Sequence, residues 1–400
     1  MAVDCLVIGG GVIGLTTAWR LAQHGFSVRV CDQSTPGREA SWAGAGILPP
    51  GDPRSVSGPV RAAGTASEAS AEIRLGSAAF RSTDGGSSAE RRTTLVDPLT
   101  RLAADTCIRW PELSSELLET TGIDNEFHRC GGLELSVGTR DELVAARSHW
   151  DAIGVRTEWL DPAAVRELEP ACSGREPAFL LPDLCQVRNP RHLAALLRAC
   201  ELAGVEVTPD CPVTGWTSRP GRLTAAVTPL GEIAAGQFCV TAGAWSSQLL
   251  ASAGVTLDVI PVRGQIVLLE PSAFRLTRVI ERDKRYLVPR RDGHILIGST
   301  EEWTGFEKGN TDEGISGLLE FATEICPALQ EARIEQCWSG LRPCATRGRP
   351  FIGPVPGWGN LLVATGHFRS GLHLSPVTAE ILVSLVQGQS QNPLWAAFGV

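Results

Sequence analysis

The chain opens with an alternation of apolar and small residues that is typical of a βαβ unit. Val3 to Ile8 forms a continuous apolar run, which predicts a buried strand. A glycine-rich turn follows, and apolar residues then recur with helical spacing from Val12 to His24. A second short apolar strand is predicted from Ser27 to Cys31. The first thirty residues therefore predict a strand, a helix and a parallel strand.

The other end of the chain shows a similar pattern. Asn360 to Ala364 predicts a short buried strand, and Leu372 to Val386 predicts a helix after the turn at residues 365–371. The two ends therefore predict parts of one α/β domain. Three strand-like segments lie between them, at Arg263–Leu269, Arg285–Pro289 and His294–Ser299.

These three segments predict a second, mainly antiparallel domain inserted in the first. The turn Arg291-Asp292-Gly293 joins the last two of them as a hairpin. Helical patterns fill the connections, at Leu99–Thr121, Arg140–Ala152 and Pro190–Ala203.

The segment from Arg54 to Thr94 differs from the rest of the chain. Ser, Ala, Gly and Arg occupy 27 of its 41 positions, and its large apolar residues follow no sustained period. Such a composition does not provide a hydrophobic core. We expect a flexible surface insertion here.

Composition excludes several classes of partner. The chain has 400 residues, 43% of them apolar, and a net charge of -8 that forms no basic patch, so nucleic acid and anionic membrane surfaces are not expected as partners. The N-terminus lacks a secretion signal, and no apolar run approaches the roughly 18 residues of a membrane span, so we expect a cytoplasmic protein. Its 12 cysteines are scattered singly, which favours reduced thiols and predicts no metal site.

The first glycine-rich turn carries the clearest chemistry. Its sequence is G-x-G-x-x-G: Gly9 permits a tight turn, Gly11 lets the backbone approach a diphosphate, and Gly14 lets helix and strand pack closely. Amides at the start of the helix favour the diphosphate charge. Asp32, at the end of the second strand, can accept hydrogen bonds from ribose hydroxyls and would repel a 2′-phosphate. The unit therefore predicts a dinucleotide site that disfavours NADP.

Two further segments of small residues suit a nucleotide site. Ser41 to Ile47 and Cys239 to Ser246 would let backbone amides approach a ring or a diphosphate. By themselves they do not separate FAD from NAD.

Eight motifs taken together are similar to the glycine oxidase branch of the D-amino-acid oxidase family of flavoproteins. In order they are GGGVIG, Asp32, SWAGAG, TAGAW, RYLVPR, SGLRP, PFIG and ATGHFRSGL, and they span nearly the whole chain apart from the Arg54–Thr94 segment. Many flavoenzymes share single motifs, but RYLVPR, SGLRP and GHFRSG together are characteristic of this branch.

The resemblance implies an α/β fold, with a Rossmann-like FAD-binding domain and an inserted, mainly antiparallel α+β substrate domain. The FAD-binding domain would comprise residues 1–52, 96–124, 183–258 and 338–400. The substrate domain would comprise residues 125–182 and 259–337. Residues 53–95 would be the flexible insertion.

The resemblance also assigns residues to the two halves of the site. Tyr286, Arg342 and Arg369 correspond to its substrate-site residues. This assignment is chemically reasonable, because a guanidinium binds a carboxylate bidentately and a phenol donates to the same group. The implied FAD-binding residues are Gly9, Gly11, Val12, Ile13, Gly14, Asp32, Ser41, Ala43, Gly44, Gly46, Val213, Ala242, Gly243, Gly366, His367, Arg369, Ser370, Gly371 and Leu372.

The implied reaction is oxidation of glycine or a small D-amino acid. A hydride would pass from the substrate Cα to FAD, and O2 would be reduced to hydrogen peroxide. We expect noncovalent FAD, because the sequence around Cys344 does not match the covalent attachment found in sarcosine oxidases. The resemblance permits a role in thiamine thiazole synthesis, and relatives are often homo-oligomers.

Three alternatives remain at this point. They are a dehydrogenase of the same fold that uses another electron acceptor, an enzyme that prefers sarcosine, and an FAD-binding protein that has lost catalysis.

Overall fold

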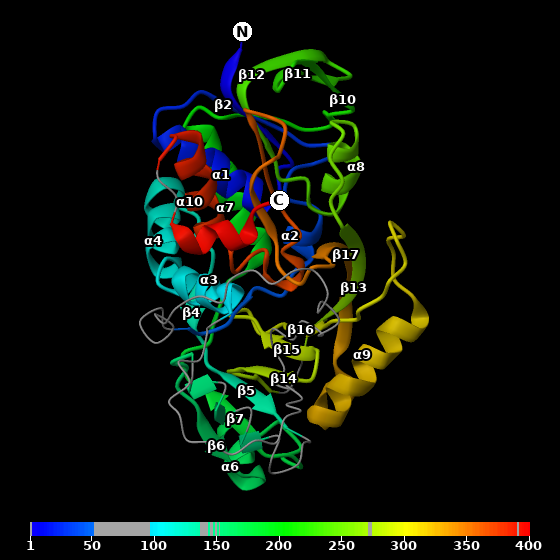
Figure 1. The fold of residues 1–400 in the computed structure, drawn as a ribbon. Helices are drawn as coiled ribbons and strands as arrows, with labels where there is room; N and C mark the ends of the chain where they lie inside the picture. The colour runs from blue at the N-terminus through cyan, green and yellow to red at the C-terminus, as the bar shows by residue number, and fades with distance from the viewer. Residues whose placement is uncertain are drawn as a thin grey trace, which may run out of the picture.

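A computed structural model describes residues 2–51, 97–136, 143–144, 147–148, 150–151, 153–270, 274–389 and 392–400. The described residues form two lobes connected by a pair of long strands (Figure 1). The expected flexible insertion at residues 53–95 lies outside the described residues, and so does most of the helix expected at Arg140–Ala152.

The first lobe contains a mixed sheet with a parallel centre. Strand β1 lies between β12 and β2, and both neighbours run parallel to it. Strand β9 extends the parallel part beyond β2, and β19 extends it beyond β12. The strands are β1 (Val3–Ile8), β2 (Val28–Cys31), β9 (Glu206–Thr208), β10 (Gly215–Arg219), β11 (Arg222–Thr228), β12 (Gly231–Val240), β18 (Phe351–Pro354) and β19 (Leu361–Thr365).

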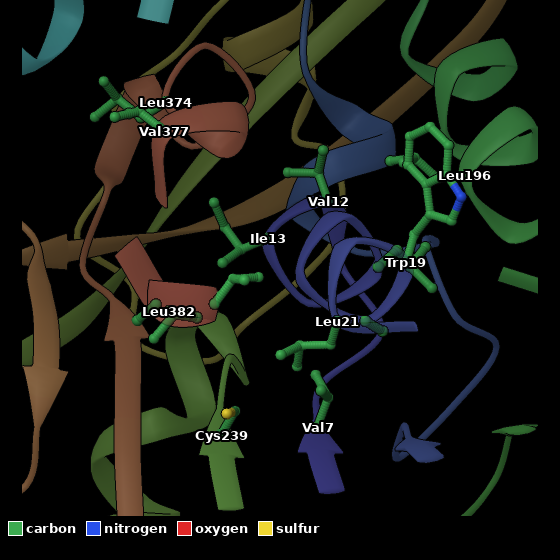
Figure 2. Packing of buried hydrophobic residues seen from close by; sticks show 14 of the residues in the cluster. Val7, Val12, Ile13, Trp19, Leu21, Leu196, Cys239, Leu374, Val377 and Leu382 are labelled. Atoms are coloured by element: carbon green, nitrogen blue, oxygen red, sulfur yellow. The ribbon is translucent and has the colours of Figure 1, made fainter. Parts of the chain in front are cut away.

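Helices cover the parallel sheet and supply the larger part of this lobe's core. In Figure 2, Ile13 and Trp19 of α1 point to opposite sides, toward Leu382 of α10 and Leu196 of α7. Burial of each such side chain contributes about 1.5 to 3 kcal/mol. The helices of this lobe are α1 (Val12–Gln23), α2 (Ala40–Ala43), α3 (Pro98–Cys107), α4 (Trp110–Thr121), α7 (Asn189–Leu202), α8 (Ser246–Ala251) and α10 (Ser375–Val386).

The second lobe is built on an antiparallel sheet with one parallel pair, β14 with β5. Its strand order is β17-β13-β16-β15-β14-β5-β7-β6. The strands are β5 (Gly132–Leu135), β6 (Glu158–Leu160), β7 (Ala178–Leu181), β13 (Val259–Glu270), β14 (Val279–Arg282), β15 (Arg285–Pro289), β16 (Ile295–Gly298) and β17 (Arg333–Ala345). Helices α6 (Pro162–Leu168) and α9 (Asp312–Ile325) complete the lobe.

The long strands β13 and β17 link the two lobes. They pair from Val259 opposite Ala345 to Glu270 opposite Arg333, so a single ladder extends from one lobe to the other. Val259 and Ala345 belong to the core of the first lobe, whereas Val267 belongs to the core of the second. A small sheet of β3 (Ile47–Leu48), β8 (Cys185–Gln186) and β4 (His128–Arg129) lies at the junction.

The predicted fold class is confirmed, and the predicted elements differ in detail. The helical pattern at Leu99–Thr121 is two helices, because Pro111 has no amide hydrogen and favours a new helix start. The last helix begins at Ser375 and not at Leu372. A 3₁₀ turn at Phe368–Ser370 precedes it, and Phe368 has a positive φ of 51°.

Gly14 is expected to be essential for the packing of α1 on the sheet. A Cβ at this position would overlap the Gly9 carbonyl oxygen and lie 2.6 Å from Thr241 Oγ1. Because the Gly9 carbonyl lies in a tight turn and the Thr241 hydroxyl donates a hydrogen bond to it, neither group can move aside easily. Gly14→Ala should therefore destabilise the protein by about 1 to 3 kcal/mol and reduce FAD retention. Thermal unfolding and flavin absorbance after gel filtration measure both effects. Gly317→Ala in α9 is the control, since a Cβ there would lie 3.7 Å from the end of the Arg285 side chain; we expect no loss of stability.

Candidate active site

A cavity of about 400 Å³ lies between the two lobes. One end is formed by the carboxyl ends of the parallel strands, with Ile8, Asp32 and Ala364 among the lining residues. The other end is formed by the antiparallel sheet, with Tyr286 and Arg342. Ligands of open α/β sheets bind outside the carboxyl ends of the strands, so the position is that of a nucleotide site.

The glycine turn after β1 has the geometry that a diphosphate requires. Gly9 has a φ of +108°, and a Cβ there would lie 2.5 Å from the Thr241 carbonyl oxygen. Gly11 occupies the N-cap position of α1, and since glycine has no side chain it makes no capping hydrogen bond to the helix amides. Among the described residues the first turn of α1 contains no acidic side chain, so the helix start remains favourable for an anion.

Asp32 holds this turn in place and also lines the cavity. Its carboxylate accepts a hydrogen bond of 2.7 Å from the Gly10 amide and one of 2.9 Å from the Ser34 amide. A carboxylate has about four acceptor positions, so Asp32 can still accept from ribose hydroxyls. The residues therefore fit the adenosine diphosphate part of FAD.

The loop from Ser41 to Gly46 is fixed from three directions. Asn189 donates to the Ser41 carbonyl at 2.7 Å, and the Trp338 indole donates to the Ala43 carbonyl at 3.2 Å. Arg290, buried under the loop, donates to the Ala45 carbonyl at 2.8 Å. Because Trp338 and Arg290 belong to or follow strands of the second lobe, these contacts place that lobe's sheet against the loop.

Two glycines in the antiparallel sheet make room for the predicted substrate-site residues. The Tyr286 ring lies across Gly298, where a Cβ would come within 2.5 Å of the ring. The Arg342 guanidinium lies across Gly264 in the same manner. Both side chains face the cavity, so the structure brings together two residues that are 56 positions apart in the sequence.

Arg342 is a cation without an acidic partner among the described residues. Its guanidinium donates to the Ser299 hydroxyl at 2.6 Å and to the Thr300 carbonyl at 3.1 Å, and both acceptors are neutral. Burial, and then the nearby charge of Arg369, lower its pKa to about 10, so it stays charged at neutral pH. A buried charge of this kind favours an anionic ligand.

Arg369, in contrast, is already paired. It donates to Glu301 at 2.8 Å, and Lys284 forms an ion pair with the same carboxylate at 3.0 Å. Burial opposes ionisation of Glu301, but its hydrogen bonds from Arg369 and Lys284 lower its pKa. Arg369 therefore lies beside the cavity with its charge largely compensated.

The register of the sheet also places two carboxylates beside Tyr286. Glu281 of β14 is directly opposite Tyr286 of β15, and Glu134 of β5 is opposite Glu281 on its other side. Both carboxylates line the cavity. Burial, and then the charge of Glu134, raise the pKa of Glu281 to about 8.

Comparison with known proteins agrees with this geometry. The family model described as "FAD dependent oxidoreductase" (DAO) matches residues 4–385. The chain belongs to this DAO family of FAD-dependent oxidoreductases.

Individual relatives are similar over nearly the whole of this chain. A glycine oxidase of Pseudomonas aeruginosa is 35% identical over 97% of this chain and 96% of its own length. The bifunctional protein ThiO/ThiG of Synechocystis sp. is 30% identical over 99% of this chain and 53% of its own length. The crystal structure of glycine oxidase from Geobacillus kaustophilus aligns with a TM-score of 0.84 at 28% identity, covering 100% of this chain and 98% of that one.

Most residues predicted for this oxidoreductase's site line the cavity. Gly14 and Gly366 do not: Gly14 packs α1 on the sheet, and Gly366 has a positive φ of 79° in the turn after β19. The predicted residues that do line the cavity are Gly9, Gly11, Val12, Ile13, Asp32, Ser41, Ala43, Gly44, Gly46, Val213, Ala242, Gly243, Tyr286, Arg342, His367, Arg369, Ser370, Gly371 and Leu372.

The histidines at this end of the cavity are neutral near pH 7. Burial lowers the pKa of His367 to about 3 and that of His373 to about 4. His367 lies 3.2 Å from the Thr378 hydroxyl, and His373 lies 3.4 Å from the Cys107 thiol. Neither is therefore expected to contribute positive charge to the cavity near neutral pH.

Sequence reasoning missed the carboxylates Glu134, Glu281 and Glu301, and Lys284. One local signal was available, because Glu281 and Lys284 lie within the four residues before the RYLVPR motif. The contribution of Glu134 could not be read locally, since it depends on the pairing of two strands about 150 residues apart.

The raised pKa of Glu281 predicts a pH-dependent cost to stability. Its ordinary value is 4.5 and its folded value is about 8, so unfolding releases a proton between these values and stability is lost as the pH rises through this range. At about 1.4 kcal/mol per pKa unit, the upper limit of this cost is about 5 kcal/mol. Glu281→Gln removes the ionisable group. We expect the variant to unfold at a higher temperature than the parent at pH 8.5 and at nearly the same temperature at pH 5.

The measurement is thermal unfolding by tryptophan fluorescence with FAD at equal saturation. Glu324→Gln is the matched control, because Glu324 is an exposed partner of Arg282 whose pKa is lowered, not raised. A difference between Glu281→Gln and the parent that does not vary with pH would contradict the assignment.

Proposed function

We propose that the chain catalyses the oxidative deamination of glycine or small D-amino acids with noncovalently bound FAD. The observation that carries the proposal is the half-buried Arg342, whose hydrogen-bond partners among the described residues are neutral and which lies with Tyr286 at the cavity wall. Such a pair suits a substrate carboxylate. The full-length similarity to glycine oxidases supports a small amino acid as the substrate.

Bound FAD supplies a two-electron acceptor that O2 reoxidises with formation of hydrogen peroxide. Glycine, water and O2 would thus yield glyoxylate, ammonia and hydrogen peroxide. The task of the chain is then to hold the substrate in one orientation. Once Arg342 and the Tyr286 hydroxyl hold the substrate carboxylate, the remaining freedom of the substrate is rotation about the bond between its carboxylate and its Cα.

The residues that would hold FAD follow from the cavity. The turn at Gly9–Gly11 and the start of α1 would bind the diphosphate, and Asp32 would accept from the ribose. The loop Ser41–Gly46 and the 3₁₀ turn Phe368–Ser370 would lie along the remainder of the cofactor. Cys344 is not among the lining residues, and burial raises the pKa of its thiol, which supports noncovalent binding.

The decisive experiment combines anaerobic reduction with peroxide detection. The purified yellow protein is mixed without oxygen with glycine, sarcosine or D-alanine, and the loss of flavin absorbance is followed. Air is then admitted and peroxide is measured. We expect bleaching by glycine and stoichiometric peroxide. Bleaching without peroxide would indicate a dehydrogenase, and no bleaching by any of the three amines would refute the proposal.

Substitution of Arg342 should weaken substrate binding strongly. Arg342→Ala removes a charge-assisted contact to the carboxylate, on the order of 3 kcal/mol, and should raise KM at least tenfold. Tyr286→Phe removes one hydrogen bond to a charged group, worth about 1.5 to 3 kcal/mol, and should be milder. Steady-state peroxide assays over a range of glycine concentrations measure both.

Arg333→Ala provides the control on the same strand. Arg333 is largely exposed and pairs with Glu270, far along β17 from the cavity. If the Arg342→Ala and Arg333→Ala enzymes have the same KM for glycine, Arg342 is not part of the substrate site.

A further inference from the structure

Two cysteines of the second lobe lie against each other in its core. The sulfur atoms of Cys172 and Cys326 are 3.4 Å apart and share a hydrogen bond, although 154 positions separate the two residues in the chain. Cys172 follows α6, and Cys326 is the residue at which α9 ends. All 12 cysteines of the chain are free, so this pair is a reduced dithiol.

The backbone around the pair is held in place. The Ser173 amide donates to the Ile325 carbonyl at 2.7 Å, so the two segments are bonded one residue away from each cysteine. The Cys172 amide also donates to the Glu169 carbonyl at 2.9 Å. A disulfide has a sulfur–sulfur distance of about 2.05 Å, so the two sulfur atoms need to approach by roughly 1.4 Å. Rotation about the side-chain bonds can provide this movement while the backbone stays fixed.

A small cavity borders the sulfur-bearing side chain of Cys172 and not that of Cys326. Its volume is about 20 Å³, which exceeds the roughly 10 to 15 Å³ that one water molecule needs. Glu176 also lines this cavity: its Oε1 atom accepts from Arg282 at 2.8 Å, whereas its buried Oε2 atom accepts no hydrogen bond among the described residues. The cavity therefore offers an acceptor to a small molecule with O–H donors, beside one of the two thiols.

Hydrogen peroxide is a molecule of this kind, and it is a product of the proposed oxidation. We propose that Cys172 and Cys326 form a peroxide-sensitive pair, in which hydrogen peroxide that enters the small cavity converts the two thiols into a disulfide. The inference rests on the proposed function only for the internal source of peroxide, since added peroxide reacts in the same way.

The reaction takes two balanced steps. The Cys172 sulfur attacks one peroxide oxygen: the S–O bond forms, the O–O bond breaks, and the thiol proton leaves with the released hydroxide as water. The Cys326 sulfur then attacks the sulfur of the sulfenic acid: the S–S bond forms, the S–O bond breaks, and a second water leaves. The two sulfur atoms lose two electrons in total, and peroxide is reduced to two molecules of water.

The surroundings of the two thiols assign the first step to Cys172. Cys326 is fully buried, and it does not border the small cavity. The hydrogen bond with Cys172, and then burial, raise the pKa of the Cys326 thiol, which makes it a poor nucleophile toward peroxide. This hydrogen bond changes once Cys172 carries an oxygen, so the main cause of the raised pKa is removed before the second step.

The disulfide would stabilise the lobe that carries the substrate-side sheet. It would close a chain segment that contains β13, β14, β15 and β16. A cross-link over a segment of this length removes conformational freedom from the unfolded chain. Neither cysteine lines the active-site cavity, so we expect oxidation to alter stability more than turnover.

Peptide mapping of the FAD-loaded enzyme tests the pair directly. The enzyme is treated with excess hydrogen peroxide without any amine, then denatured, alkylated with iodoacetamide and digested without reductant. We expect the number of alkylated cysteines to fall from 12 to 10, and a peptide pair joined through Cys172 and Cys326 to appear. Dithiothreitol should reverse both changes. The oxidised protein should unfold at least about 3 °C above the reduced protein.

Single substitutions assign the two roles. In Cys326→Ser, Cys172 should stop at the sulfenic acid, which dimedone labels; in Cys172→Ser, the Cys326 thiol should remain open to alkylation. Cys200→Ser is the matched control, because Cys200 is equally buried and its thiol donates to the Leu15 carbonyl, so the disulfide should form there as in the parent. If a variant does not fold, the peptide map of the parent enzyme still decides the question.

The outcomes separate this inference from the proposed function. During turnover with glycine and air the same disulfide should accumulate, and catalase should prevent it. If glycine yields no peroxide, glycine oxidation is refuted, while a disulfide formed by added peroxide still supports the pair.

Three results would overturn the pair. The first is that all 12 cysteines remain alkylated after peroxide treatment. The second is that Cys172 is oxidised to the sulfinic or sulfonic acid without a cross-link. The third is a cross-link only between other cysteines, such as Cys31 and Cys211, whose sulfur atoms are 3.7 Å apart.

Discussion

A half-buried guanidinium that has no carboxylate partner among the described residues favours an anion, and the substrate site proposed at Arg342 depends on this preference. Arg342 can occupy its position because Gly264 has no side chain on the facing strand and because Ser299 and Thr300 supply two neutral acceptors. Had a carboxylate replaced either acceptor, the charge would be satisfied within the protein and an anionic substrate would gain little. The chain pairs Arg369 with Glu301 and leaves Arg342 available, so the two neighbouring arginines have different electrostatic roles.

The position of Arg342 depends in turn on the contacts between the lobes. Arg342 belongs to β17, which pairs with β13 in a ladder that extends from the core of one lobe to the core of the other. A shift of Arg342 would therefore disturb both lobes. Arg290 adds a second connection: it follows β15 directly and reaches the loop that lines the cavity on the other side. A cofactor bound on the parallel sheet and a substrate bound on the antiparallel sheet would thereby be held at a fixed separation, as the proposed hydride transfer requires.

The sequence predicted those parts of the site whose chemistry is local. A glycine turn after a strand, an acid after the next strand and a tyrosine inside RYLVPR are each contained in a few neighbouring residues, and the structure places them at one cavity. The parts that depend on strand pairing were not predictable from periodicity. Strand β17 was missed because its exposed and buried positions do not alternate regularly, and Glu134 acquires its neighbour only through the parallel pairing of β5 with β14. The break at Pro111 was readable from proline chemistry, whereas the late start of α10 depends on the turn conformation at Phe368.

The cavity face of the antiparallel sheet carries polar side chains near both of its edges. Arg342 contributes positive charge near β17, Tyr286 lies in the middle, and Glu281 and Glu134 contribute carboxyl groups near β5. An amino acid is itself a dipole, so this arrangement favours one direction of binding and disfavours the reverse. Position 281 is also structurally permissive, since its neighbours in β14, Ile280 and Arg282, face the opposite side and hold the strand in the core and in ion pairs. A substitution of Glu281 therefore changes a charge at the cavity wall and leaves the core contacts of Ile280 and the ion pairs of Arg282 in place.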